Sequence, residues 1–521
     1  MLQKILNSRF LVIYIIPFFL GLLTVLSFQP FNFSFINFIL LPIFFFLIVY
    51  IKKKSKGVYR KKKPYWKNLF LVGVSFGFGF YLSGIFWIAY SLTFEENFKF
   101  LIPFAVLFIP LFLSLFNGLT TLAIGHFLNY NFSSILLFSA SLSLSDYLRG
   151  KILTGFPWNL WAYSWSWTPE ILQTLNFLGV YAFNILVLTI FTIPACLFFN
   201  YKKSKQILIT SFTFLFVFLL YIYGTYSINK NKGLLNYINN ANKVYIKVIS
   251  PNFELKYNTS ISEIEDKIRK LVRLSDPDPK KETIFVWPEG VFTGFSYNEI
   301  AQFSHMIEEN FNDNHLIIFG INTQNYKSGG YYNSLILINN KFKIIYQYDK
   351  IKLVPFGEFL PFERALNKIG LKKITQGHGS FSKGGTQQNI IYNKLNILPL
   401  ICYEIIFPEL VQRTNNKTNL IINISEDGWF GNSIGPHQHL AKAVFRAIEN
   451  NSFLIRSANK GNSVIISNKG EIIKKLNVYE SGNIEMNVPL LNEKYKNKND
   501  LIFFTVLFTY LLIFLIFKNK K

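Results

Sequence analysis

The sequence predicts a multi-span α-helical membrane domain, with about eight transmembrane helices, joined to an α/β domain outside the cytoplasm. Half of the 521 residues are hydrophobic and 57 are phenylalanine, which is too apolar for a soluble chain of this length. By contrast, 24 of the 29 acidic residues fall between positions 228 and 499. The chain is therefore predicted to divide into a membrane domain (1–227), a polar domain (228–499) and a last helix with a short basic tail (500–521).

Apolar runs that are long enough, or nearly so, to cross roughly 30 Å of hydrocarbon account for the membrane helices. Seven precede the polar domain and one follows it: residues 10–28, 35–51, 69–90, 101–128, 133–148, 175–199, 207–226 and 501–517. The first run has the basic flank of a signal peptide. It is longer than usual and no small-residue cleavage site follows, so a retained anchor is predicted. The fifth run is the weakest, because it contains Asp146 and several serines.

Basic residues predict the orientation. Nine Lys or Arg lie between positions 52 and 67, three lie in 202–205, and Lys518, Lys520 and Lys521 end the chain. If every run spans, all of them share one side, which the positive-inside rule makes the cytoplasm. Both termini would then be cytoplasmic and the polar domain would lie outside.

The net charge of +25 also raises nucleic-acid binding as an alternative. Outside the polar domain there are 20 basic residues against 5 acidic ones, and they cluster in short tracts beside the apolar runs. This distribution indicates topology signals, so no nucleic-acid partner is predicted.

The polar domain has the mixed pattern of an α/β fold. Ser260 with Glu263 three residues on makes a capping box for a helix over 260–272. Further helices are predicted over 300–311 and 441–449. Apolar runs of strand length occur at 244–249, 284–287, 316–321, 334–338, 342–348, 398–402, 420–424, 454–457 and 463–467.

Three polar side chains stand where predicted strands stop: Glu289, Lys350 and Cys402. Taken singly, each is more simply explained, as a solvated cap, a surface charge and a small buried hydrophobe. Cys402 has no disulfide partner in the polar domain, because the other cysteine, Cys196, lies in the sixth apolar run. An unpaired thiol on the oxidising side is either inert or kept for its reactivity.

No metal or other cofactor is predicted. No second cysteine and no His-x-x-x-His pattern accompanies Cys402, and no glycine-rich phosphate loop is evident. His437 and His439 are two positions apart, which is poor spacing for ligands on a helix, so both are predicted to be structural.

The sequence motifs around these three residues resemble those of a known enzyme superfamily. Trp287-Pro288-Glu289, then Lys350 running through Leu353-Val354-Pro355-Phe356-Gly357-Glu358, then Ile401-Cys402-Tyr403-Glu404 resemble the catalytic triad of the nitrilase superfamily. The resemblance implies a layered αββα sandwich. Together with the eight spans, Gly155-Phe156-Pro157-Trp158 and the stretch from Asp427 to His439, the whole chain resembles the membrane-embedded apolipoprotein N-acyltransferases of bacterial envelopes. It departs from their pattern at Ser250, Glu426 and Lys460, where Gln, Asn and Asn are usual.

The residue types suggest their roles. A thiol is only a few per cent ionised near neutrality, so Cys402 needs a base, which would be Glu289. Attack on an ester creates an oxyanion, for which Lys350 and the backbone amide of Tyr403 are the candidate stabilisers. Glu358 and Glu404 would pair with Lys350 or steer protons, since a buried lysine needs such a partner.

Substrate contacts are predicted at Trp158, Trp429 and Phe430. The tryptophan-rich loop that contains Trp158 would either anchor the protein at the membrane interface or line an acyl-chain entrance. Trp429 and Phe430 would either touch substrate or pack the domain.

The resemblance also implies the partners: a phospholipid acyl donor, a diacylated lipoprotein acceptor and the lipid bilayer of a bacterial inner membrane, with residues 228–499 in the periplasm. One alternative is a membrane-tethered amidase acting on small amides, although one span would suffice to anchor it. The other is a transporter or a non-catalytic binding protein. Few charges interrupt the spans, and the intact Glu, Lys and Cys set disfavours a dead enzyme.

Overall fold

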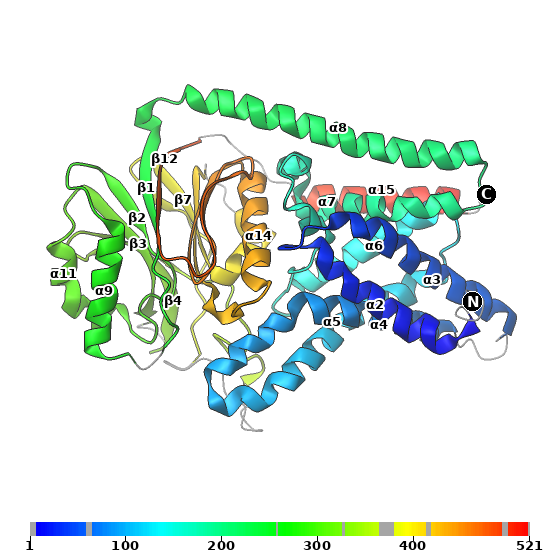
Figure 1. The fold of residues 1–521 in the computed structure, drawn as a ribbon, viewed down its shortest axis with the longest axis horizontal. Coiled ribbons are helices and arrows are strands. Elements are labelled where there is room, and N and C mark those ends of the chain that lie inside the picture. The colour runs from blue at the N-terminus through cyan, green and yellow to red at the C-terminus, as the bar shows by residue number, and fades with distance from the viewer. Residues whose placement is uncertain are drawn as a thin grey trace. The chain divides into compact units, whose positions relative to one another are not determined.

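The computed structural model describes residues 7–58, 65–256, 259–325, 329–363, 380–412, 418–491 and 499–518. The chain forms two compact units (Figure 1). One contains Met1–Ser227 and Lys498–Lys521, and the other contains Ile228–Asn497. The predicted basic residues Lys520 and Lys521, and part of the tract between 52 and 67, lie outside the described residues.

The first unit is entirely helical in its described part, as its apolar composition predicts. Its main helices are α2 (Ile16–Leu23), α3 (Asn37–Val58), α4 (Tyr65–Ile85), α5 (Ile102–Gly125), α6 (Phe132–Lys151), α7 (Leu175–Thr192), α8 (Lys203–Asn236) and α15 (Asn499–Phe517). Six helical stretches among the described residues are long and apolar enough to cross a membrane: Ser34–Lys54, Tyr65–Phe94, Glu96–Gly125, Ile171–Phe198, Lys203–Asn236 and Asn499–Phe517. The chain is therefore a multi-span membrane protein.

Two predicted runs fall outside these six. The run at 10–28 becomes a shorter apolar helix, Leu11–Ser27, and the run at 133–148 becomes α6. Inside α6, Asp146 and Arg149 form a buried ion pair with 2.9 Å between Oδ1 and Nη2. Asn184 of α7 donates a second hydrogen bond to Asp146 at 3.0 Å. Asp146 is thus paired within α6 and by α7, so this helix is buried although its polar residues make its hydropathy low.

Two glycines permit the close packing of α2 on α4. A Cβ added to Gly21 would lie 2.0 Å from the carbonyl oxygen of Phe76, and one added to Gly79 would lie 2.0 Å from that of Phe18. Neither position can hold a larger residue without separating the two helices.

The second unit contains two six-stranded sheets. The first has the order β12-β1-β2-β3-β4-β5 and the second β11-β10-β9-β8-β7-β6. Their bounds are β1 Lys243–Ser250, β2 Thr283–Val286, β3 His315–Gln324, β4 Tyr331–Asn339, β5 Ile344–Asp349, β6 Ile390–Tyr392, β7 Leu395–Ile401, β8 Leu420–Glu426, β9 Phe453–Asn459, β10 Ser463–Ile466, β11 Ile472–Leu476 and β12 Gly482–Pro489. β1, β2 and β3 pair in parallel, as do β7, β8 and β9.

Apolar side chains from both sheets form one core, which includes Val286, Leu335, Ile401, Ile422 and Ile455. Helices cover the outer faces (Figure 1). α9 (Ile261–Ser275), α10 (Tyr297–Ile300) and α11 (Ser304–Glu308) lie on the first sheet, while α14 (Gly435–Asn450) lies on the second and the short α13 (Pro408–Gln412) packs against α14. The capping box predicted at Ser260 and Glu263 is present at the start of α9. The αββα layering implied by the family resemblance is therefore confirmed.

Some predicted elements differ from the observed ones. The single helix predicted over 300–311 is two short helices, α10 and α11, joined by a 3₁₀ turn. The edge strands β6, β11 and β12 are not in the prediction. β11 is mostly exposed and β12 has several polar residues, so neither has the apolar run used to predict strands.

Candidate active site

Glu289, Lys350 and Cys402 each follow a strand of the central sheets. Glu289 comes three residues after β2, Lys350 directly after β5, and Cys402 directly after β7. All three are buried, with exposed fractions of 8%, 1% and 8%. Lys350 Nζ lies 3.4 Å from Glu289 Oε1, and the charges of both groups act on the pKa of Cys402. The structure thus gathers the three residues that the sequence predicted, one of them from the second sheet and two from the first.

Lys350 is the buried cation of the site. Its Nζ donates a 2.8 Å hydrogen bond to Glu358 Oε1 in addition to its contact with Glu289. Burial alone lowers the pKa of Lys350, but the negative charges of Glu289 and Glu358 outweigh it and hold this pKa above its ordinary value. The positive charge of Lys350 is therefore favoured, and it lowers the pKa of the Cys402 thiol.

Asn333, in β4, is a member of the site that the sequence analysis missed. Its side-chain amide donates to Glu289 Oε1 at 2.8 Å and to Glu358 Oε1 at 2.7 Å, so it holds the two carboxylates that flank Lys350. Its own carbonyl oxygen accepts from the backbone N–H of Lys350 at 2.8 Å. The only available signal was an asparagine directly before the apolar run that begins at Ser334.

Cys402 has an unusual backbone for a residue with a side chain. Its φ is +48°, in the left-handed region, where the strand turns into a short 3₁₀ helix. Burial raises the pKa of its thiol above the ordinary value and the charge of Glu289 adds to the rise, whereas Lys350 lowers it. The resting thiol is therefore protonated and needs a neighbouring base before it can attack. Of the carboxylates whose charge raises this pKa, Glu289 and Asp427, Glu289 has the larger effect.

Glu404 holds the loop of Cys402 against the strand end that carries Lys350. Its carboxylate accepts from the backbone N–H of Ile401 at 2.9 Å, of Ile351 at 2.7 Å and of Lys352 at 3.1 Å, and from the hydroxyl of Tyr348. Burial raises the pKa of Glu404 to about 7, although these N–H groups and the charge of Lys350 lower it. Glu404 therefore links the end of β5 in the first sheet to the end of β7 in the second. The carboxylate that accepts a hydrogen bond from Lys350 is that of Glu358 and not that of Glu404.

Of the three departures from the family pattern, Glu426 touches the site. Its backbone N–H donates to Glu289 Oε2 at 3.0 Å. Its side chain accepts from Gly428 N at 2.9 Å and from Asn459 Nδ2 at 2.8 Å. Burial raises the pKa of Glu426 well above the ordinary value. Ser250 Oγ instead donates to the carbonyl oxygen of Glu480, and Lys460 pairs with Glu254 at 2.6 Å.

The aromatic residues predicted to touch substrate fall in both units. Phe430 is buried and its ring meets that of His439 edge-on at 5.2 Å, while Trp429 is partly exposed. Trp158, in the membrane unit, is buried against Trp87, with 4.6 Å between ring centroids. Phe430 and Trp158 therefore have packing roles, and their contact with substrate stays a prediction.

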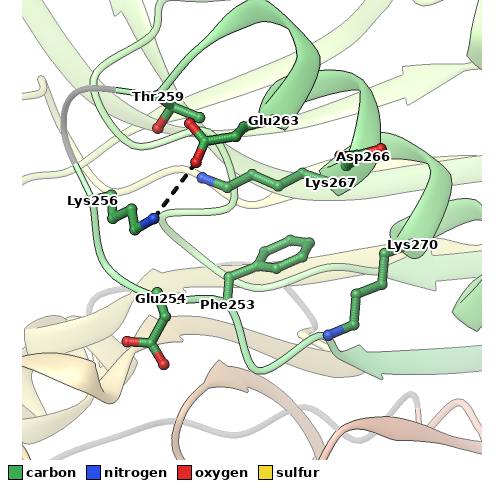
Figure 2. Close-up of a pocket in the computed structure, with 8 residues that line it drawn as sticks. All are labelled: Phe253, Glu254, Lys256, Thr259, Glu263, Asp266, Lys267 and Lys270. Atoms are coloured by element: carbon green, nitrogen blue, oxygen red, sulfur yellow. Dashed lines mark hydrogen bonds and ion pairs between the residues drawn. The ribbon is translucent and has the colours of Figure 1, made fainter.

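A surface pocket lies beside α9 (Figure 2) and contains none of the three predicted catalytic side chains. Its lining is Phe253, Glu254, Lys256, Thr259, Glu263, Asp266, Lys267 and Lys270. The ammonium groups of Lys267 and Lys270 lie 5.6 Å and 5.4 Å from the centre of the Phe253 ring, and Lys256 pairs with Glu263 at 3.5 Å. Three lysines thus face three acidic residues, so the pocket has no net charge that would select a ligand.

Known proteins resemble both units. Residues 20–193 match the family model of the apolipoprotein N-acyltransferase N-terminal domain, and residues 259–490 match that of carbon-nitrogen hydrolase. The apolipoprotein N-acyltransferase of Rhodopseudomonas palustris is 30% identical over 489 residues, which is 91% of this chain and 89% of that protein. The Rickettsia typhi enzyme of the same name is 31% identical over 91% of this chain and 92% of its own.

Among solved structures, a nitrilase-superfamily protein of Saccharomyces cerevisiae aligns over 48% of this chain and 90% of its own, at 16% identity and a TM-score of 0.36. The membrane helices, the αββα unit and the length over which the curated relatives match lead to one conclusion. The chain belongs to the apolipoprotein N-acyltransferase family and is a membrane acyltransferase of the carbon-nitrogen hydrolase superfamily that acts on lipid and lipoprotein substrates.

Proposed function

We propose that Cys402 accepts an acyl chain from a membrane phospholipid as a thioester and passes it to the N-terminal α-amine of a diacylglyceryl-cysteine lipoprotein. The main support is the buried set of Glu289, Lys350 and Cys402 at strand ends of facing sheets. A base, a fixed cation and a thiol are what acyl transfer through a thioester requires.

In the first half-reaction, Glu289 takes the thiol proton while sulfur attacks the ester carbonyl. The oxyanion that forms is stabilised by the ammonium group of Lys350 and the backbone N–H of Tyr403. The carbon–oxygen bond then breaks, and Glu289 gives its proton to the departing oxygen of the lysophospholipid. Glu358 and Asn333 hold the side chains of Lys350 and Glu289 in place in both half-reactions.

The second half-reaction repeats these roles, with the acceptor amine as the nucleophile and the thiol of Cys402 as the leaving group. Glu289 takes a proton from the attacking α-amine, a second oxyanion forms at the same place, and the carbon–sulfur bond breaks. The products are the amide and the free thiol of Cys402, which regains a proton. Both halves use one oxyanion site, so one set of donors serves both.

Intact mass of the purified protein tests the thioester. After incubation with phospholipid and without acceptor, we expect the mass to rise by one acyl group, and mild hydroxylamine should remove it. Adding a diacylated lipopeptide should return the enzyme to its original mass and add the acyl group to the peptide. A protein that transfers the chain without ever gaining mass would contradict the proposal.

We further propose that residues 228–499 form the catalytic domain on the periplasmic side of the inner membrane, with both termini in the cytoplasm. The support is the shared side predicted for the basic tracts at 52–67 and 202–205. A cysteine placed at exposed Ser262, in a variant without Cys196 and Cys402, should react in intact spheroplasts with a membrane-impermeant maleimide. A cysteine placed at exposed Lys53 should react only after lysis. Labelling of the cysteine at position 53 and not of the one at position 262 in intact spheroplasts would contradict the proposed orientation.

A further inference from the structure

The backbone of Cys402 requires an external restraint. A left-handed φ costs a residue with a Cβ roughly 1–2 kcal/mol, and such a conformation persists only where the surroundings impose it. Strand β7 fixes the chain before Cys402, but the following peptide, between Cys402 and Tyr403, begins a short turn. The orientation of that peptide matters, because its N–H is the proposed oxyanion donor.

His439, on α14, contacts this peptide. Its Nε2 lies 3.2 Å from the carbonyl oxygen of Cys402, and its side chain is fully buried. A carbonyl oxygen only accepts, so Nε2 carries the proton in this contact. A peptide unit is planar, with its C=O and N–H pointing in opposite directions. Holding the oxygen of Cys402 therefore aims the N–H of Tyr403 to the opposite side.

Two charged groups lie at the other ring nitrogen of His439. Arg456 Nη2 and Asp427 Oδ1 are each 3.0 Å from Nδ1, so Nδ1 accepts from the guanidinium in a neutral ring and donates to the carboxylate in a protonated one. The same Nη2 bonds both oxygens of Asp427, at 2.9 Å and 2.8 Å. Burial lowers the pKa of His439 to about 4 and the charge of Arg456 adds to the fall, whereas the charge of Asp427 raises it. In either protonation state of the ring, the contact with the carbonyl oxygen of Cys402 places a proton on Nε2.

Asp427 ties this arrangement to the thiol as well. Ser425 Oγ donates to Asp427 Oδ1 at 2.7 Å, and the side chain of Ser425 lowers the pKa of the Cys402 thiol. The side chain of Asp427 has room in this position because residue 461 is glycine. A Cβ there would lie 2.2 Å from Asp427 Oδ2. The Asp427–Arg456 pair thus supports both the side chain and the carbonyl group of Cys402.

We propose that His439 is a positioning residue for the oxyanion site: its Nε2–H holds the Cys402 carbonyl so that the Tyr403 amide faces the reacting carbonyl. This inference rests on the nucleophilic role proposed for Cys402. Without the histidine N–H, only the backbone of the 3₁₀ helix Cys402–Ile406 restrains the peptide, and its amide is aimed less firmly at the oxyanion. Loss of one oxyanion donor typically slows acyl transfer by roughly 10²–10³-fold.

The test compares two reactions of one thiol in His439→Leu, His439→Gln and the wild type. Thioester formation from phospholipid needs the oxyanion site, whereas alkylation of Cys402 by iodoacetamide is a displacement that forms no oxyanion. In His439→Leu we expect thioester formation to slow by about 100-fold, with alkylation within about threefold of wild type. His439→Gln, whose side-chain amide reaches the place of Nε2, should recover at least tenfold of the loss.

Each outcome decides the matter. Equal losses of thioester formation and alkylation in His439→Leu would overturn the inference, as would a Gln variant no better than Leu. Failure of both variants to fold, followed by thermal unfolding, would also overturn it, because the histidine would then serve the domain and not the peptide. A wild type that forms no thioester on Cys402 would refute the proposed function instead, before any variant is compared.

Discussion

Replacing Cys402 with alanine is expected to lower acyl transfer by at least about 10⁴-fold, the scale at which removing a catalytic nucleophile acts in related acyl-transfer enzymes. The variant keeps Glu289, Lys350 and Glu358, so lipid ester and oxyanion donors would still meet. It lacks an atom able to form the acyl-enzyme, and direct attack by the acceptor amine would need both substrates in the site at once. Labelled phospholipid and a diacylated lipopeptide measure the transfer, and intact mass measures the acyl-enzyme.

The chain contains a matched control for this variant. Cys196 is the other cysteine, buried in the membrane unit, and Cys196→Ala removes the same atom far from any predicted catalytic group in the sequence. We expect it to keep acyl transfer within about threefold of wild type and to gain acyl mass normally. If Cys196→Ala lost the acyl-enzyme and Cys402→Ala kept it, the thioester would have been assigned to the wrong sulfur.

The clustering of the three proposed catalytic residues was predictable because each follows an apolar strand within a recognisable sequence motif. The strand ends before Glu289, Lys350 and Cys402 can be predicted from the neighbouring residues, and the residue types suggest their chemistry. Asn333 was not predictable in this way. It acts because β4 lies between β3 and β5 in the sheet, which places its amide between two carboxylates that are 69 positions apart in the chain, Glu289 and Glu358. Pairing of strands is a property of the fold, and no local pattern reveals it.

The contact made by His439 was likewise not predictable from the sequence. His437 and His439 were predicted to be structural, since their spacing suits no metal site. His439 is indeed buried and hydrogen-bonded, and one of its partners is the carbonyl group of Cys402, the proposed nucleophile. His439 lies on α14 and Cys402 follows β7, and these two elements are far apart in the sequence, so only the fold shows that they are in contact. In the membrane unit, α6 is not among the helices that are apolar enough to cross a membrane. Its buried residues Asp146 and Arg149 lower its hydropathy, while Asp146 pairs with Arg149 and with Asn184 of α7.

Replacing Lys350 with methionine should have the second largest effect, on activity and stability together. Lys350 is fully buried between Glu289 and Glu358, so its removal leaves two carboxylates that share one amide donor, Asn333. Removing one partner of a buried ion pair typically costs about 3–5 kcal/mol of unfolding free energy. The two carboxylates would then retain a proton between them, which takes the base away from Cys402. Thioester formation should fall by at least about 10³-fold, since the oxyanion loses its cation as well.

A second substitution separates the two effects. In Lys350→Met combined with Glu358→Gln, the unpaired negative charge is gone, and the amide of the new glutamine can still bond its neighbours. Stability, measured by thermal unfolding of the detergent-solubilised protein, should return most of the way to wild type. Thioester formation should stay low, because the positive charge beside the developing oxyanion is still missing. Recovery of both in the double variant would mean that Lys350 only neutralises Glu358, and the oxyanion would then depend on the Tyr403 amide and the His439 contact that holds it.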